Sequence, residues 1–146
     1  MSAEDLLQIV AIEREATPSP WSVKQFEQSL EQHHCLVMAA DEHANLILGY
    51  AVVSTLLDQA EVLNICINPQ YQGRGLGSQL LSHLLKQMPD DVEIVYLEVR
   101  VSNFRAIRLY QNHGFITVGE RRDYYPTEFG REDALLMNLQ IQQTRD

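Results

Sequence analysis

The chain has 146 residues, of which 45% are hydrophobic and 21% are charged. A chain of this length forms one ordinary domain that buries roughly 70% of its unfolded surface, and the composition excludes disorder and fibrous structure. Eleven basic against twenty acidic side chains leave a formal charge of −9, which argues against duplex DNA or RNA as the main partner and favours a basic protein or peptide. One domain over residues 1–146 is expected.

Neither a membrane span nor secretion is indicated. The longest uncharged apolar stretch, Leu46–Leu57, is too short to cross a bilayer. The chain opens Met-Ser-Ala-Glu-Asp without a basic-then-apolar leader, so the cytoplasm is the expected location. Cys35 and Cys66 form no zinc or Cys-x-x-Cys spacing and are expected to be reduced core thiols. The five histidines show no ligand spacing either, so no metal is expected.

The first part of the chain predicts two helices followed by strands. Capping boxes, in which a serine is followed three residues later by an acid or amide, open helices over Ser2–Ala16 and Ser22–Gln32. Glu13 lies at the same helical spacing as the apolar residues of the first helix. Trp21 is expected to dock the second helix, and proximity to substrate stays open as an alternative. Strands are predicted over Leu36–Asp41, Ile47–Leu56 and Glu61–Ile67, with a turn at His43–Asn45.

The rest of the chain alternates strands and helices. The segment Tyr71–Gly77 precedes a helix with a leucine stripe that ends at Pro89. A strand over Val92–Val99, a helix from Asn103 to Gly114, and closing strands over Phe115–Arg121 and Ala134–Leu139, separated by a Tyr-Tyr-Pro turn, follow. Strands joined by a helix are expected to be parallel, and open sheets bind ligands at the carboxyl ends of such strands. The glycine segment, Glu98 and Asn103 all fall at that edge.

The glycine segment has the composition of a phosphate-binding loop. Gly73, Gly75 and Gly77 permit sharp turns that expose N–H groups before a helix N-terminus, where phosphate or pyrophosphate binds well, and Arg74 adds a positive charge. No Gly-Lys-Ser/Thr follows, which excludes a Walker loop, and Ser78 stands where a dinucleotide fingerprint needs glycine or alanine. A purely structural turn is the alternative interpretation.

These motifs resemble those of a known superfamily. Gln72-x-x-Gly75-x-Gly77 resembles the pyrophosphate loop of the Gcn5-related N-acetyltransferase superfamily, which binds acetyl-coenzyme A. The segment Asn64–Pro69 looks like its fourth strand, and Leu97–Phe115 looks like its fifth strand and fourth helix. The resemblance implies a single-domain α/β fold, in which a mixed central sheet is flanked by helices on both faces. The family usually begins with a short strand, where this sequence predicts a helix. The sequence therefore leaves undecided which strand forms that edge of the sheet.

The resemblance also implies which residues hold acetyl-coenzyme A. The strand backbone before the loop should bind the acetyl and pantetheine amides, and the loop should bind the pyrophosphate. Asn103 should contact the pantetheine arm or cap its helix, and both roles are compatible. The implied cofactor-binding residues are Ile65, Cys66, Ile67, Gln72, Gly73, Arg74, Gly75, Leu76, Gly77, Ser78 and Asn103.

Two residues are candidates for proton transfer. Family members use a glutamate at the position of Glu98, which makes this residue the candidate base, directly or through a water. Pairing with Arg100 or with a helix N-terminus is the alternative. Tyr110 is the implied acid for the coenzyme thiolate, with packing against the sheet as its alternative. Cys66 has no histidine or asparagine partner nearby in sequence, so direct transfer is favoured over a covalent intermediate.

The tail indicates the substrate class. Arg122-x-Tyr124-Tyr125-Pro126, followed by Gly130–Ala134, resembles family members that acetylate protein N-termini, in particular those acting on the N-terminal alanine of a small-subunit ribosomal protein. This implies that Tyr124 and Tyr125 line the peptide entrance and that Glu132 or Asp133 attracts a basic residue of the peptide. The alternative interpretation is that Glu132 and Asp133 are exposed charges before a strand. A lysine or small-amine acetyltransferase and a non-catalytic coenzyme A sensor are the competing functions.

Overall fold

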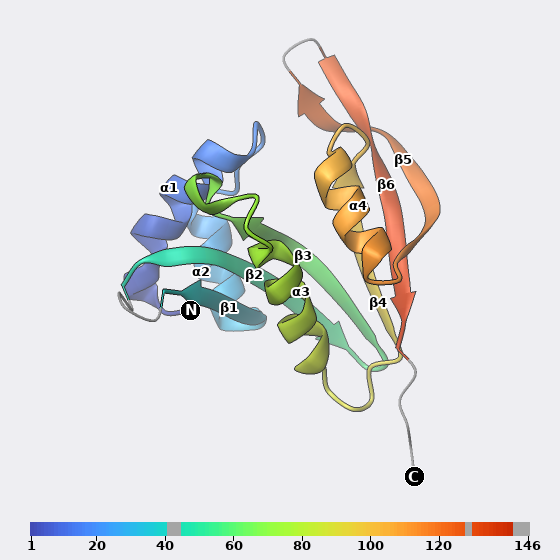
Figure 1. Cartoon of the computed structure of the whole chain (residues 1–146), viewed down its shortest axis with the longest axis horizontal. Coiled ribbons are helices and arrows are strands. Elements are labelled where there is room, and N and C mark those ends of the chain that lie inside the picture. Colours follow the sequence, from blue (N-terminus) through green and yellow to red (C-terminus); the bar gives the residue numbers. More distant parts are fainter. Residues whose placement is uncertain (41–44, 128–129, 142–146) are drawn as a thin grey trace. The chain divides into compact units, whose positions relative to one another are not determined.

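A computed structural model describes residues 1–40, 45–127 and 130–141 (Figure 1). Within them, six strands form one sheet in the order β1-β2-β3-β4-β6-β5. β1 and β2 are antiparallel, β3 and β4 are parallel, and β6 is antiparallel to both β4 and β5. The sheet is therefore mixed, as the sequence predicts. The chain divides into two compact units, one comprising Met1–Ser54 and Leu63–Lys86 and the other Thr55–Val62 and Gln87–Asp146.

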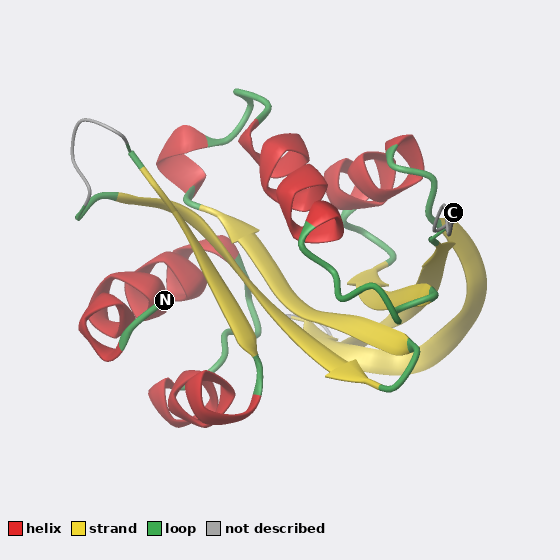
Figure 2. Ribbon diagram, turned by 90° about the horizontal axis from the view of Figure 1, so that it is seen from below, coloured by secondary structure: helices red, strands yellow, loops and turns green. Residues whose placement is uncertain are grey.

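The first unit combines three helices with strands from the first half of the sheet. It contains a 3-10 turn at Ala3–Asp5, the helices α1, α2 and α3, and strand β1, together with most of β2 and the carboxyl half of β3. The bounds are α1 Leu6–Ala16, α2 Val23–Gln32, β1 His34–Ala39, β2 Ile47–Leu56, β3 Gln59–Ile67, a 3-10 turn Pro69–Tyr71, and α3 Leu76–Lys86. α1 and α2 cover one face of these strands, and α3 covers the other (Figure 2).

Local sequence signals explain these helices. Both predicted capping boxes form: the Ser2 N–H donates to the Asp5 carboxylate at 2.8 Å, and the Ser22 N–H donates to the Gln25 side chain at 2.8 Å. The first box opens a 3-10 turn before α1 begins at Leu6. Apolar side chains of α1 and α2 then pack on β2 in a buried cluster of Leu6, Ile9, Val10, Ile12, Phe26, Ile47 and Tyr50.

The second unit is built on the other strands. It contains β4 Ile94–Arg100, α4 Phe104–Asn112, β5 Ile116–Thr127 and β6 Gly130–Gln140. The parallel β3–β4 ladder runs from Gln59↔Ile94 to Val62↔Leu97. No helix among the described residues is long and apolar enough to cross a membrane.

One sequence prediction about the second unit is wrong. The predicted Tyr-Tyr-Pro turn is part of β5, because Tyr125 pairs with Glu132 and Pro126 with Arg131. Proline has no backbone N–H to donate, and it is tolerated there because β5 is the last strand of the sheet and pairs with another strand on one side only. Most of the other predicted turn, His43–Asn45, lies outside the described residues.

Candidate active site

The glycine loop connects β3 to α3 through backbone in the left-handed region. Gly73 and Gly75 have φ angles of 81° and 76°, which residues with a side chain rarely adopt. A Cβ atom added at either position would meet nothing within 4 Å. The glycines are thus required by the backbone conformation, and space remains above both. The Gln72 side chain anchors the loop, because its Nε2 donates to the Ile67 carbonyl at 3.2 Å.

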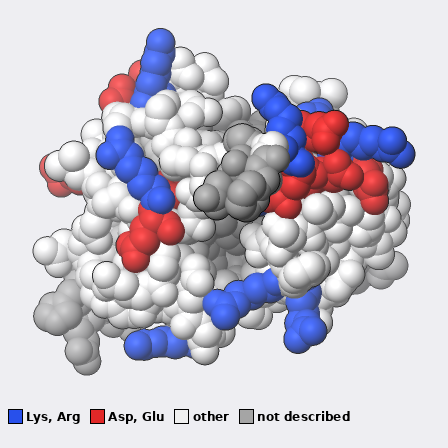
Figure 3. All heavy atoms as spheres, turned by 90° about the horizontal axis from the view of Figure 1, so that it is seen from above, with Lys and Arg blue, Asp and Glu red and all other residues white. Residues whose placement is uncertain are grey.

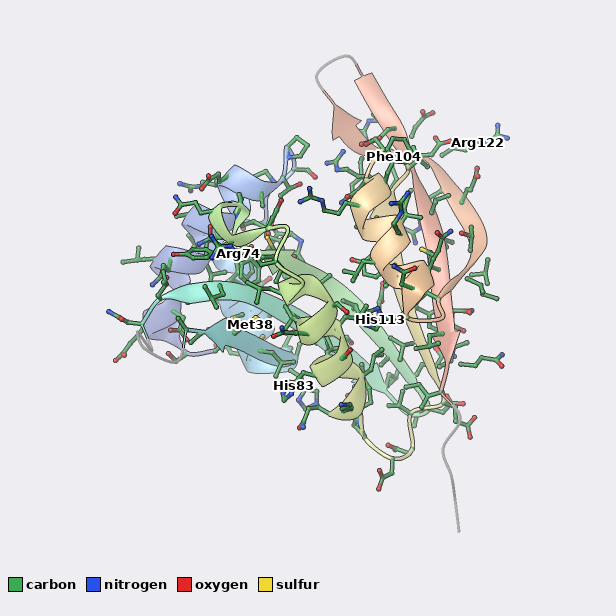
Figure 4. The ribbon with its side chains drawn as sticks, viewed as in Figure 1. Met38, Arg74, His83, Phe104, His113 and Arg122 are labelled. Carbon is green, nitrogen blue, oxygen red and sulfur yellow. The ribbon has the colours of Figure 1, made fainter. Side chains whose placement is uncertain are left out.

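The loop leads directly into the first turn of α3. The Gln79 N–H donates to the Gly75 carbonyl at 3.2 Å, so the preceding N–H groups, including those of Leu76 and Gly77, belong to the positive end of the helix. The Arg74 guanidinium lies 5.3 Å from the centroid of the Tyr71 ring, on the same loop (Figure 4). This combination of N–H groups and a cation suits a phosphate-bearing ligand.

The carboxyl half of β3, which carries Ile65, Cys66 and Ile67, lies tightly against β2. A Cβ atom added at Gly49 of β2 would lie 2.8 Å from the Cys66 carbonyl oxygen and 2.6 Å from Ile67 Cδ1. Glycine at this position therefore permits the close approach of the two strands. β3 runs to Ile67, beyond the last ladder pair of its parallel partner at Val62.

The Cys66 thiol is poorly suited to nucleophilic attack. Its pKa is raised to about 11, chiefly by burial and to a smaller extent by the Glu13 carboxylate, while the hydrogen bond with the Tyr50 hydroxyl lowers the pKa by less than burial raises it. A thiol with such a pKa stays protonated near neutral pH, whereas the thiolate is the nucleophilic form. Both cysteines are free.

In the second unit, β4 presents two chemically different faces. Its residues alternate between buried and half-buried, and the buried ones are the apolar Val95, Leu97 and Val99. α4 lies on this apolar face, because a Cβ atom added at Gly114, just beyond the helix, would lie 3.2 Å from Leu139, which pairs with Val95. Glu98 alternates with these residues and so lies on the opposite face.

Glu98 has a different partner from the one considered in the sequence. Its Oε1 lies 3.4 Å from Arg121 Nε, and the side chains are 19% and 52% exposed, respectively. Arg100 instead pairs with Glu132 at 2.8 Å. No sequence signal pointed to Arg121, because it comes from β5, two strands away from β4.

Tyr110 and Asn103 belong to α4. Tyr110 is buried, with its ring centroid 5.9 Å from that of Phe115. Asn103 caps the helix, because its Oδ1 accepts a hydrogen bond from the Ala106 N–H at 3.2 Å. Since α4 covers the apolar face of β4, Tyr110 and Glu98 lie on opposite sides of the second unit's strands.

The two tail tyrosines are stacked with arginines. Tyr124 and Tyr125 meet edge to face with centroids 4.9 Å apart. Arg100 lies over the Tyr125 ring at 4.4 Å and Arg121 over the Tyr124 ring at 4.8 Å. Burial raises the pKa of Tyr125 to about 12, aided by the negative charge of Glu98 and opposed by both arginines. The structure thus brings Tyr124, Tyr125 and Glu98 together, with the arginines between them.

The carboxylates of Glu132 and Asp133 both accept hydrogen bonds from residues of the second unit. Hydrogen bonds from Arg100 and then Ser102 lower the pKa of Glu132. Asp133 Oδ1 accepts a hydrogen bond from the Asp123 N–H at 2.9 Å, and Asp123 has a left-handed φ of 52° at an irregularity in β5. Acidic and basic side chains gather side by side on the side of the molecule where β5 and β6 lie (Figure 3).

The mixed sheet and the glycine loop that leads from β3 into α3 define an α/β protein class whose strand–loop–helix junction suits a phosphate-bearing ligand. The model of the acetyltransferase (GNAT) family matches residues 6–115. The chain belongs to this family. Among the described residues, no group of three or more His, Cys, Asp or Glu side chains is arranged to hold a metal ion.

Individual relatives cover nearly the whole chain. A [ribosomal protein bS18]-alanine N-acetyltransferase from Salmonella typhimurium is 40% identical, over 97% of this chain and 95% of the relative. The crystal structure of the ribosomal-protein-S18-alanine N-acetyltransferase from Escherichia coli has a TM-score of 0.89 and 36% identity, covering 100% of this chain and 94% of the other. A GNAT acetyltransferase from Elizabethkingia anophelis with acetyl-CoA bound shares the fold, with a TM-score of 0.73 and 22% identity over 90% and 89% of the two chains.

Proposed function

We propose that this protein is an N-α-acetyltransferase that moves the acetyl group of acetyl-CoA to the N-terminal alanine of ribosomal protein bS18. The observation that carries the proposal is the 40% identity, over nearly the full length of both chains, with a bS18-alanine N-acetyltransferase. A substrate that is a bacterial ribosomal protein would locate the reaction in the cytoplasm. The charge of −9 suits a basic peptide partner.

The first unit has the features that acetyl-CoA needs. The pyrophosphate would contact the loop Gln72–Ser78, where both glycines with left-handed backbone leave open space and Arg74 supplies a positive charge. The backbone of Ile65, Cys66 and Ile67 would bind the acetyl and pantetheine amides in the manner of a neighbouring strand. When bound, acetyl-CoA supplies an activated acyl group on a thiol that leaves readily.

The second unit would move the protons. Glu98 would accept a proton from the attacking α-amine, directly or through water, as the new C–N bond forms. Tyr110 would donate a proton to the sulfur as the C–S bond breaks, and Asn103 would contact the pantetheine arm near its helix cap. A free α-amine has a pKa near 7.8, so roughly a quarter of it is neutral at about pH 7.4, whereas only about a thousandth of a lysine is. The protonated state of Cys66 supports direct transfer without an acetyl-cysteine intermediate.

The peptide entrance would be aromatic. Tyr124 is 41% exposed, and with Tyr125 it would pack against the first residues of the peptide. The Glu132 carboxylate is paired with Arg100 at 2.8 Å. A basic second residue of the peptide would therefore bind Glu132 by competing with Arg100 for this carboxylate. Asp133 would act indirectly, by holding the irregular segment of β5 in shape.

Mass spectrometry after incubation with acetyl-CoA tests this function. One peptide begins with a free alanine followed by a basic residue, and the control peptide has a blocked N-terminus and an internal lysine. Acetylation of the free alanine alone is expected. Acetylation of the internal lysine would assign the protein to the lysine or small-amine class, and acetyl-CoA binding without acetylation of any amine would indicate a sensor.

A further inference from the structure

A buried carboxylate in the first unit has been given no role above. Glu13 of α1 is only 3% exposed. Its Oε1 accepts a hydrogen bond from the Tyr50 hydroxyl at 2.7 Å. Its Oε2 accepts from the Trp21 N–H at 3.0 Å and from Asn64 Nδ2 at 3.1 Å. Three donors from three separate parts of the chain thus converge on one side chain.

A buried carboxylate is costly to desolvate, and an apolar residue would serve a mere packing role better. The groups that Glu13 joins indicate what it does. Trp21 belongs to the connection between α1 and α2, which has no regular secondary structure over Thr17–Ser22. Asn64 belongs to β3, directly before the residues proposed to hold the acetyl group. Glu13 therefore fastens an irregular connection to the strand that would present the acetyl group.

The Tyr50 hydroxyl completes this network. Burial, followed by the nearby Cys66 and Glu13, raises its pKa well above the ordinary range, so the hydroxyl remains a donor. The Tyr50 ring also contacts Phe26 with centroids 5.8 Å apart, and Phe26 contacts Trp21 at 5.2 Å. The Trp21 segment is thus held through its backbone by Glu13 and through its side chain by an aromatic series that ends at Tyr50.

The side of the sheet on which this network lies gives it a role. α1 and α2 cover the face of the first unit opposite α3 (Figure 2). Glu13 ties the Trp21 N–H to Asn64, which directly precedes the residues proposed to hold the acyl group, so an acceptor peptide that reaches this group would come close to the Trp21 segment. We propose that Glu13 is a positioning residue for the acceptor peptide, holding the Trp21 segment at the correct place beside β3. This inference rests on the proposed acetyltransferase function.

The chain offers a direct probe, because Trp21 is its one tryptophan. Trp21 fluorescence is followed while the full-length protein, with coenzyme A present, is titrated with the alanine-initiated peptide, and steady-state acetylation is measured in parallel. Three variants are compared. Glu13→Met keeps the volume and removes all acceptors. Glu13→Gln retains one acceptor oxygen and rescues part of the network, because a tyrosine hydroxyl can also accept a hydrogen bond. Glu15→Gln changes an exposed acid of the same helix and serves as the control.

We expect the peptide to change Trp21 emission in the wild type. In Glu13→Met, the Kd and KM for the peptide should rise at least about fivefold, in keeping with the loss of a hydrogen-bonded anchor, while the Kd for acetyl-CoA stays within about twofold. Glu13→Gln should lie between Glu13→Met and the wild type, and Glu15→Gln should match the wild type. Folding of each variant is verified by its thermal transition, and measurements are made well below it.

Two results would overturn the positioning role: an unchanged peptide KM in folded Glu13→Met, or equal losses of affinity for peptide and acetyl-CoA. Failure of the proposed function looks different. In that case the wild type itself neither acetylates the free alanine nor shows a change in Trp21 emission with the peptide, whatever residue occupies position 13.

Discussion

Substitution of Gly75 separates the phosphate-binding role of the loop from its backbone role. Gly75 has a φ of 76° and open space where a Cβ would lie. Gly75→Ala therefore costs only backbone strain of about 1–2 kcal/mol, which corresponds to a decrease in Tm of roughly 3–7 °C for a domain of this size. No clash adds to this cost, so both Gly75→Ala and Gly75→Glu should fold.

The glutamate adds a charge that the alanine lacks. At a separation of about 6 Å, two like charges repel by about 0.7 kcal/mol in bulk water and by about 2.8 kcal/mol at an effective dielectric constant of about 20. A single charge pair thus weakens acetyl-CoA binding by about 3-fold to about 100-fold, and the two charges of a pyrophosphate favour the upper end of this range. Gly75→Ala should lose far less affinity, because its change is confined to the backbone.

Isothermal titration calorimetry with acetyl-CoA and a thermal melt measure the two effects independently. Gly114→Ala is the matched control for strain, because Gly114 also has a left-handed φ, of 94°, and an added Cβ would in addition lie 3.2 Å from Leu139. This control should lose stability and keep its acetyl-CoA affinity. If Gly75→Glu binds acetyl-CoA as tightly as Gly75→Ala, the pyrophosphate does not contact this loop and the reasoning is refuted.

Three further predictions concern the chemistry. Glu98→Gln should lower kcat/KM most at low pH, where little free amine is present without a base, and a mutant-to-wild-type ratio that is flat with pH would count against the base role. Tyr110→Phe, which keeps the aromatic contact with Phe115, should slow release of the free thiol without abolishing it, because a thiol with a pKa of about 8.5 leaves without full protonation; complete inactivity would give tyrosine a larger role. Cys66→Ala should remain active. It should also lose stability less steeply than the wild type between about pH 9 and pH 11, because the unfolded thiol ionises above its ordinary pKa of 9.0 while burial raises the folded pKa to about 11; identical alkaline unfolding curves would contradict this.

Features encoded by neighbouring residues were predictable from the sequence. The serine capping boxes and the leucine stripe of α3 are local signals, and α2 and α3 form where these signals occur. β2 has the predicted bounds for the same reason. The family motif predicted the loop because it combines glycines at fixed spacing with a following helix.

Features set by strand register were not predictable. Considered with its sequence neighbours alone, Pro126 indicates a turn, yet it lies in β5. That β5 is the last strand of the sheet follows from the order of all six strands, which the local sequence does not encode. The Glu98–Arg121 pair depends on that order as well and on the irregularity that follows Arg121 in β5. Glu13 did leave a signal, because an acid at an apolar helical position must find hydrogen-bond donors when it is buried.

The alternation of β4 bears directly on the proposed reaction. Acetyl transfer to an amine takes one proton from the acceptor and delivers another to the departing sulfur, and the proposed reaction assigns these tasks to two residues. Glu98 faces away from α4, whereas Tyr110 lies within α4 on the other face of the strand. A strand places successive side chains on opposite faces, so a single strand with its covering helix would keep the proposed proton acceptor and the proposed proton donor apart. Because the two side chains lie on opposite faces of β4, the effects of Glu98→Gln and Tyr110→Phe on log kcat should be additive. A double variant no slower than the slower single one would show that the two residues act as a coupled pair.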